Sequence, residues 1–188
     1  YVMFRSRRQI VQQYGIAFWK SFRKSSCKNL REILPQVPDI GPSIFSLNYR
    51  FLPIYVAWYR AFQALGLGAE EIDRCIWMMN DQMLAGTSGW FSKLVGRKYY
   101  HSFQRKAASH LKRQTLQQLH PLDWQIAYRV LSKEAFEIDI MTCPFERLSK
   151  EFGVPGLLPG ICRMDYLCAN RMGNGFTRTK TLGDGDDC

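Results

Sequence analysis

The chain has 188 residues, of which 46% are apolar and 14% aromatic, enough to bury one sizeable core without dividing. The longest apolar run, residues 51–58, is far shorter than the roughly 18 residues that cross a bilayer, so we expect no membrane span. The formal net charge of +10 would attract polyanions, but no zinc-finger spacing, aromatic RNA-binding signature or helix-turn-helix accompanies it. We therefore expect one domain over residues 1–188 and no nucleic-acid partner.

The six cysteines are too few and too irregularly spaced for the disulfide framework of a secreted domain, which favours a cytoplasmic location. The three histidines, His101, His110 and His120, lie on or just after one expected helix and lack the spacing of a metal site. The sequence also lacks a nucleophile elbow, a phosphate-binding loop, a zinc-protease motif and a dinucleotide fingerprint. We therefore expect no metal and no cofactor.

Helical periodicity dominates residues 1–120. The expected helices span residues 2–14, 16–34, 53–65, 69–84, 88–95 and 97–119. In the fourth of these, Cys75 belongs to the apolar stripe, so we expect it in the core. Because residue 1 is Tyr and not Met, we expect a further segment to precede it.

The helix expected at 97–119 carries a basic stripe. Its members are Lys98, Arg105, Lys106, Lys112 and Arg113. Such a stripe is typical of a solvated helix face, and it is also compatible with a phosphate-binding or anionic-membrane face. In either case, a positive field would concentrate an anionic carboxylate near the protein.

After Pro121 the apolar period changes to two. Residues 124–131 and 136–143 are expected to form an antiparallel hairpin, with Glu137 and Asp139 as solvated acids on its outer face. This predicts an α+β fold, in which an N-terminal helical layer packs on a small C-terminal antiparallel sheet. Cys143 precedes a helix that opens with Pro144, and a thiol at a helix N-terminus is expected to have a depressed pKa.

The last thirty residues gather polar chemistry. A helix at 158–172 would place Cys162 and Asp165 one turn apart, with Tyr166 also one turn from Cys162. The Gly-Asn-Gly at 173–175 should end that helix, and residues 176–182 alternate like a strand. We therefore expect a terminal hairpin to complete the segment 121–188.

Three motifs in this segment resemble the L-2-amino-thiazoline-4-carboxylic acid hydrolase family. They are an acidic strand ending in Cys143-Pro144, a helical Cys162-Arg163-x-Asp165-Tyr166, and Arg178-Thr179-x-Thr181-Leu182 leading to Gly185-Asp186-x-Cys188. The closing turn also looks like that of vinyl-reductase-type ligand-binding domains, a similarity that bears on the fold alone. The first resemblance implies a hydrolase that opens a small cyclic amidine such as 2-aminothiazoline-4-carboxylate at a carbon–nitrogen bond.

Such a reaction needs attack on an electrophilic ring carbon, protonation of a ring nitrogen and an anchor for the substrate carboxylate. The resemblance ranks Cys162 and Cys188 above Cys143 as nucleophile candidates. Asp165 is the candidate acid or base, provided that burial raises its pKa.

Arg178 is the candidate anchor, because a guanidinium can hold a carboxylate through paired hydrogen bonds. Its alternative role is a structural ion pair with Asp165. Thr179 and Thr181 are candidates for orienting the small, carboxylate-bearing heterocyclic substrate.

Three alternatives remain open at this stage. The fold could serve as a noncatalytic ligand-binding domain, as a basic adaptor for polyanions or membrane surfaces, or as a scaffold for another step of a biosynthetic pathway. The sequence selects neither the exact substrate nor an oligomeric state, and a homo-oligomer is left open.

Overall fold

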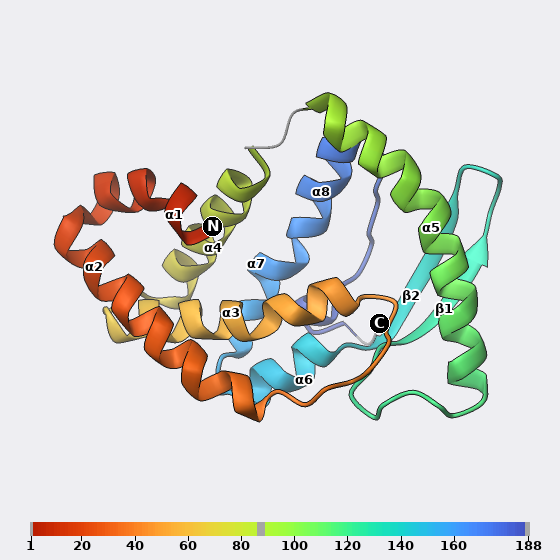
Figure 1. Cartoon of the computed structure of the whole chain (residues 1–188), viewed down its shortest axis with the longest axis horizontal. Helices are drawn as coiled ribbons and strands as arrows, with labels where there is room; N and C mark the ends of the chain where they lie inside the picture. Colours follow the sequence, from red (N-terminus) through yellow and green to blue (C-terminus); the bar gives the residue numbers. More distant parts are fainter. Residues whose placement is uncertain (1, 86–88, 187–188) are drawn as a thin grey trace.

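A computed structural model of the chain describes residues 2–85 and 89–186, and it has the expected α+β architecture (Figure 1). Helices form most of the described chain, and a small antiparallel sheet lies in its C-terminal half. No helix among the described residues is both long enough and apolar enough to cross a membrane.

Four helices form the N-terminal layer. They are α1 (Val2–Arg5), α2 (Arg7–Ile33), α3 (Ser46–Ala64) and α4 (Ala69–Ala85). Helix α2 lies alongside α3, and Phe22 stacks on Phe62 across this contact with ring centroids 4.2 Å apart. The break expected near residue 15 is present as a kink inside α2, where Gly15 has a φ of +86° that disfavours other residues.

Several helix boundaries differ from the sequence prediction, and the helix expected at 2–14 is divided at Ser6 between α1 and α2. Helix α3 begins at Ser46, and Pro53, where we expected it to begin, lies buried inside it. The residues expected to form two helices at 88–95 and 97–119 form one, α5 (Gly89–Thr115), while Ser88 lies outside the described residues. Gly96 lies inside α5 at a point of close packing, where a Cβ would lie 2.7 Å from the Cβ of Met172.

The predicted hairpin is confirmed as β1 (Gln125–Val130) and β2 (Phe136–Thr142), paired antiparallel. Its inner face packs against α5, where the Phe103 and Phe136 rings stack with centroids 5.1 Å apart. On the outer face, Arg129 forms ion pairs with both Glu137 and Asp139, which are exposed or partly exposed as expected.

Buried residues of the N-terminal layer, of α5 and of the hairpin form one apolar cluster, which extends along the chain from α2 to the start of α7. Cys75 is 3% exposed and belongs to this cluster, which confirms its expected place in the core. His110 on α5 is fully buried, and its Nε2 lies 2.8 Å from the Trp124 carbonyl oxygen, so this imidazole helps to join α5 to the sheet.

The C-terminal part contains α6 (Pro144–Glu151), α7 (Leu158–Cys162) and α8 (Met164–Met172). The single helix expected at 158–172 is thus interrupted at Arg163. Gly173 ends α8 in the left-handed conformation, with a φ of +72°, as the glycine predicted.

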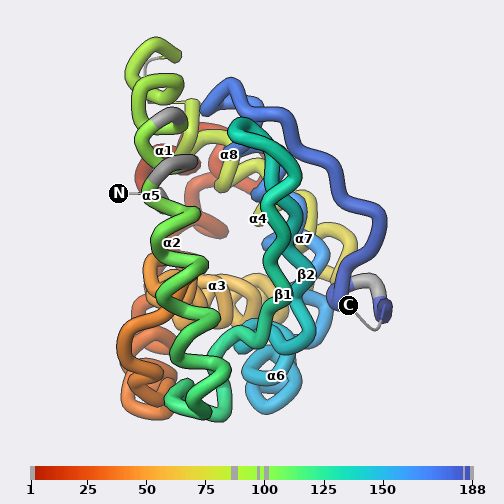
Figure 2. Tube along the Cα trace, turned by 90° about the vertical axis from the view of Figure 1, so that its right-hand side faces the viewer, coloured from red at the N-terminus to blue at the C-terminus, as the bar shows by residue number. Residues whose placement is uncertain are grey.

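The strand expected at 176–182, and with it the terminal hairpin, is wrong for the described residues. This segment is irregular up to a short 3-10 helix, η3 (Leu182–Asp184), and it forms no strand ladder. The Arg178 side chain of this segment instead hydrogen-bonds to α7 and α8. Figure 2 shows the hairpin of β1 and β2 between α5 on one side and this C-terminal segment on the other.

Candidate active site

Arg178 is the centre of the polar cluster predicted near the C-terminal helices. Its Nη1 donates to the Asp165 Oδ2 at 3.0 Å, and its Nη2 donates to the Cys162 carbonyl oxygen at 2.7 Å. The guanidinium also lies 5.2 Å from the ring centroid of Tyr166 and 5.5 Å from that of Phe176. One side chain of the C-terminal segment therefore binds both sides of the break between α7 and α8.

The aromatic pair around Arg178 forms one wall of a groove. The Tyr166 and Phe176 rings meet edge to face, with centroids 4.9 Å apart, and the Tyr166 hydroxyl donates to the Arg178 carbonyl oxygen at 3.4 Å. The groove has a volume of about 380 Å³. It is lined by Tyr166, Leu167, Ala169, Asn170, Asn174 and Phe176. Amide groups and aromatic faces thus lie beside the ion pair.

The Asp165 carboxyl has a pKa shifted in the direction that general-acid catalysis requires. Burial raises the pKa of its carboxyl, and the nearby Arg178 guanidinium opposes this effect. Half of the side chain is nevertheless exposed, so a small molecule can reach it. Its other neighbours are Tyr99 of α5, whose pKa burial raises to about 12, and Cys168 of α8, whose pKa burial raises to about 11; the Asp165 charge adds to both shifts.

Cys162 is partly buried beneath the turn formed by the C-terminal segment. A Cβ on Gly183 would lie 3.3 Å from the Cys162 Sγ and 3.3 Å from the Thr181 Oγ1, so both groups border the same point. The turn is closed by the Thr181 amide, which donates to the Asp186 Oδ2 at 2.8 Å, and by the Asp186 amide, which donates to the Thr181 carbonyl oxygen.

Cys143 lies at the N-terminus of α6, but its predicted pKa depression is wrong. Burial raises the pKa of this thiol to about 11 and outweighs the lowering effect of hydrogen bonds from the Phe145 and Glu146 amides and from Trp124. The Cys162 thiol raises this pKa further, and α6, which Cys143 precedes, packs against α7. At neutral pH, Cys143 is therefore a packed thiol and not a thiolate.

The structure brings together most of the predicted site residues. Cys143, Cys162, Asp165, Arg178 and Thr181 lie in one region, whereas Thr179 is exposed on the segment between Arg178 and the turn. Cys188 lies outside the described residues. No group of three or more His, Cys, Asp and Glu side chains in residues 2–85 and 89–186 is arranged to hold a metal ion.

Sequence reasoning missed the residues that shape the groove. Phe176 was assigned to a strand and Asn174 to a helix-ending turn, and neither was given a part in the site. Tyr99 of α5 is distant in sequence, and nothing in the local pattern pointed to its proximity to Asp165. The sequence predicts the pairing of Asp165 with Arg178 only as the alternative to a substrate anchor.

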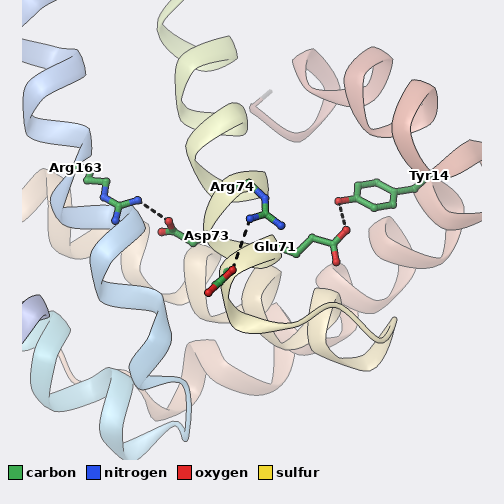
Figure 3. Close-up of polar contacts among 6 residues, drawn as sticks. Tyr14, Glu71, Asp73, Arg74 and Arg163 are labelled. Atoms are coloured by element: carbon green, nitrogen blue, oxygen red, sulfur yellow. Dashed lines mark hydrogen bonds and ion pairs between the residues drawn. The ribbon is translucent and has the colours of Figure 1, made fainter.

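A contact with α4 fixes the break between α7 and α8 (Figure 3). Arg163, at the break, donates to the Asp73 Oδ2 of α4 at 2.6 Å. The second oxygen, Asp73 Oδ1, packs against the backbone of Gly160 in α7. A Cβ at position 160 would lie only 2.6 Å from this oxygen. On the other side of α4, the Tyr14 hydroxyl donates to the Glu71 Oε1 at 2.9 Å. Helix α4 therefore ties the α7–α8 break to the N-terminal layer.

These features define a small α+β protein in which a guanidinium paired with a carboxyl of raised pKa lies against two aromatic rings that line a groove, while a partly buried thiol lies on the neighbouring helix α7. The sequence profile of the L-2-amino-thiazoline-4-carboxylic acid hydrolase family matches residues 47–188. The chain belongs to this family, which confirms the resemblance carried by the C-terminal motifs. The match begins at the start of α3 and includes all of the candidate site residues. No curated protein and no solved structure matches the chain.

Proposed function

We propose that the protein hydrolyses a carbon–nitrogen bond in a small, carboxylate-bearing cyclic amidine or a related heterocycle derived from an amino acid. The family membership supports hydrolysis, and the Asp165–Arg178 pair beside the groove is the observation that carries the proposal. The proposed substrate class is that of 2-aminothiazoline-4-carboxylate, opened toward a carbamoyl-cysteine.

Arg178 is the proposed carboxylate anchor. Both of its terminal nitrogens are engaged, one by Asp165 and one by the Cys162 carbonyl oxygen. A substrate carboxylate can take the place of the half-exposed Asp165 without disturbing the second bond. This exchange would remove the positive charge that holds the Asp165 pKa down, so substrate binding itself would favour protonation of Asp165.

The protonated Asp165 would then serve as the general acid. The Cys162 S–H adds across the ring carbon–nitrogen double bond, with its sulfur on the amidine carbon and its proton on the ring nitrogen. The ring carbon–nitrogen bond then breaks as that nitrogen takes the Asp165 proton. Water then adds to the same carbon and returns a proton to the Asp165 carboxylate. The carbon–sulfur bond to Cys162 breaks as the remaining hydroxyl becomes the product carbonyl, and the proton of that hydroxyl passes to the Cys162 sulfur. Thr181, which borders the same point as the Cys162 Sγ, is the proposed orienting hydroxyl, with Thr179 at the exposed edge. Cys143 is assigned to packing, and Cys188 stays a candidate.

The test is turnover of 2-aminothiazoline-4-carboxylate by the purified protein, followed by mass spectrometry of the ring-opened product. Asp165→Asn should lower kcat by about 10²- to 10⁴-fold, the usual contribution of a positioned acid. Arg178→Lys should mainly raise KM, and Cys162→Ala should abolish turnover. Lys180→Gln, an exposed neighbour on the same segment, is the matched control and should behave like the wild type. Turnover by Cys162→Ala with loss in Asp165→Asn would instead mean direct attack by water.

A noncatalytic ligand-binding role is the second candidate, and one observation favours it. The shifted thiol pKa values among the described residues, those of Cys75, Cys143 and Cys168, are all raised, so burial does not activate these thiols. Calorimetric binding of the same compound with no product formed, abolished in Arg178→Ala, would establish this role in place of hydrolysis.

A further inference from the structure

Helix α5 has two faces with different surroundings. Its inner face packs on α8 and β1 through small or buried residues. These are Ser92, Gly96, Phe103, Ala107 and His110. On the first two turns, large apolar side chains outside this set are exposed, with Trp90 76% and Phe91 53% exposed. Leu94 and Val95 continue the same surface at 39% and 37% exposure. We name Trp90, Phe91, Leu94 and Val95 the apolar turn of α5.

The charge on α5 has a single sign. The helix contains lysines and arginines and no aspartate or glutamate over its whole length. Lys93 lies within the apolar turn, with the stem of its side chain next to Gly173 at the end of α8, Lys98 follows the apolar turn, and Arg105 and Lys106 lie further along the helix; all four are exposed. A groove of about 500 Å³ connects the two regions. It is lined by Val95, Lys98, Tyr99, Ser102 and Arg105. Exposed aromatic and aliphatic groups therefore lie next to exposed basic side chains on one helix.

Folding alone does not account for this surface. Exposing four large apolar side chains within two turns forgoes their burial, and such a patch marks an interaction site in a soluble chain. Trp, Phe and Leu with adjacent Lys and Arg are the combination found in helices that lie in the plane of a lipid interface. A nucleic acid would use the cations but offers no apolar phase for Leu94 and Val95, which makes it the poorer match.

We propose that α5 docks on an anionic membrane surface, with the apolar turn at the boundary between headgroups and acyl chains and with Lys93, Lys98 and Arg105 on lipid phosphates. Lys and Arg near such a surface each contribute about fivefold to partitioning, and the contribution decreases as salt screens it. The inference is independent of the proposed hydrolysis, because it uses none of the groups assigned to the reaction.

Co-sedimentation of the whole protein with vesicles tests the proposal. Vesicles of phosphatidylglycerol and phosphatidylcholine should retain the protein, vesicles of phosphatidylcholine alone should not, and raising the salt from 0.05 to 0.5 M should release it. Trp90→Ser/Leu94→Ser should lower the partition coefficient by at least about tenfold, because two interfacial side chains are lost. Lys98→Gln/Arg105→Gln should lower it by about twenty- to thirtyfold, since two charges are removed.

Two matched controls isolate the effect. Leu131→Ser removes an apolar side chain, 63% exposed, from the turn of the hairpin, and it should leave vesicle binding unchanged. Trp90→Phe keeps an aromatic anchor, so it should retain binding but lose most of the blue shift in tryptophan emission on anionic vesicles. Circular dichroism shows whether each variant is folded. If Trp90→Ser/Leu94→Ser does not fold, Lys98→Gln/Arg105→Gln still tests the proposal, because both of its substituted side chains are exposed.

Equal binding to neutral and anionic vesicles, or no binding to either, would overturn the proposal. So would vesicle binding that both double variants leave unchanged. Sedimentation equilibrium gives the remaining outcome: a dimer that Trp90→Ser/Leu94→Ser converts to a monomer, without vesicle binding, would assign the apolar turn to a second copy of the chain and reject the membrane.

Discussion

Gly183 packs directly on Cys162: a Cβ at position 183 would come within 3.3 Å of the Cys162 Sγ and within 3.2 Å of the Leu158 Cβ. This contact joins the C-terminal turn to α7 at the thiol proposed to react. The position therefore tolerates no side chain without movement of the turn or of Cys162.

Gly183→Ala is expected to lower the free energy of unfolding by about 1–3 kcal/mol, the usual cost of overpacking, and to reduce turnover as Cys162 shifts. Gly175→Ala is the matched control, because nothing lies within 4 Å of its Cβ position. That variant should be neutral or more stable by up to about 1 kcal/mol, since alanine restricts the unfolded chain. Denaturant titration measures both, and equal stabilities would contradict the close packing at Gly183.

Gly96→Ala should separate α5 from α8. Replacing glycine by alanine in a helix interior ordinarily increases the free energy of unfolding by about 1 kcal/mol. Here the new Cβ would lie 2.7 Å from the Cβ and 2.7 Å from the carbonyl oxygen of Met172, and backbone atoms cannot give way cheaply. We expect a net loss of about 1–3 kcal/mol in thermal or denaturant unfolding. Gly89→Ala, in the same helix with open space around it, should show no loss; a gain in both variants would refute the contact.

Cys143 should resist alkylation. With a pKa of about 11, roughly one thiol in a thousand is ionised at pH 8, and the thiolate is the reactive form. Iodoacetamide at pH 8, followed by peptide mass spectrometry, should label the exposed Cys27 first and leave Cys143 unmodified in the folded protein. Both should react in urea. Rapid labelling of Cys143 in the folded state would show that the amides at the start of α6 outweigh its burial.

The raised pKa of Asp165 predicts how the stability of the protein depends on pH. Its pKa in the folded protein is raised above the unfolded value of about 3.9, so the folded state binds this proton more tightly. The resulting stabilisation is complete below the unfolded pKa and is lost as the pH rises through the folded pKa. Asp165→Asn lacks this loss and keeps an oxygen that can accept from Arg178.

The melting temperature of Asp165→Asn relative to wild type should therefore increase as the pH is raised from 3.5 to 7. The increase should be small, because half of the side chain is exposed and water screens it. A relative melting temperature that instead falls over this range would mean that the ion pair with Arg178, and not burial, controls the carboxyl.

Periodicity predicted the parts of the fold that depend on local pattern. The change of period after residue 121 gave the hairpin, and Gly15 and Gly173 marked a kink and a helix end because their positive φ is a local requirement. Pro53 and Gly96 were wrong as helix boundaries. Each is buried inside a helix that continues through it, and a local pattern does not show this burial. The alternation at 176–182 was real, but a strand needs a neighbouring strand, which a local pattern does not supply.

The candidate site was predictable to the same extent. Cys162, Asp165 and Arg178 are separated by few residues, so helical spacing and a short return segment were enough to bring them together. Tyr99 and Asp73 were not predictable, because each reaches this region through the packing of another helix. The exposure of Trp90 was likewise invisible in the pattern, which cannot distinguish a core stripe from an outward one.

The bond between Arg163 and Asp73 joins positions 90 residues apart. Cys162 and Asp165 lie on opposite sides of the break that this bond holds, so the angle between α7 and α8 sets their separation. Among members of the family, substitutions at position 73 should therefore be accompanied by substitutions at positions 160 and 163. Such covariation would preserve the angle between α7 and α8 while the reacting residues stay constant. An attempt to graft the reacting residues onto another scaffold would have to carry this distant carboxylate with them.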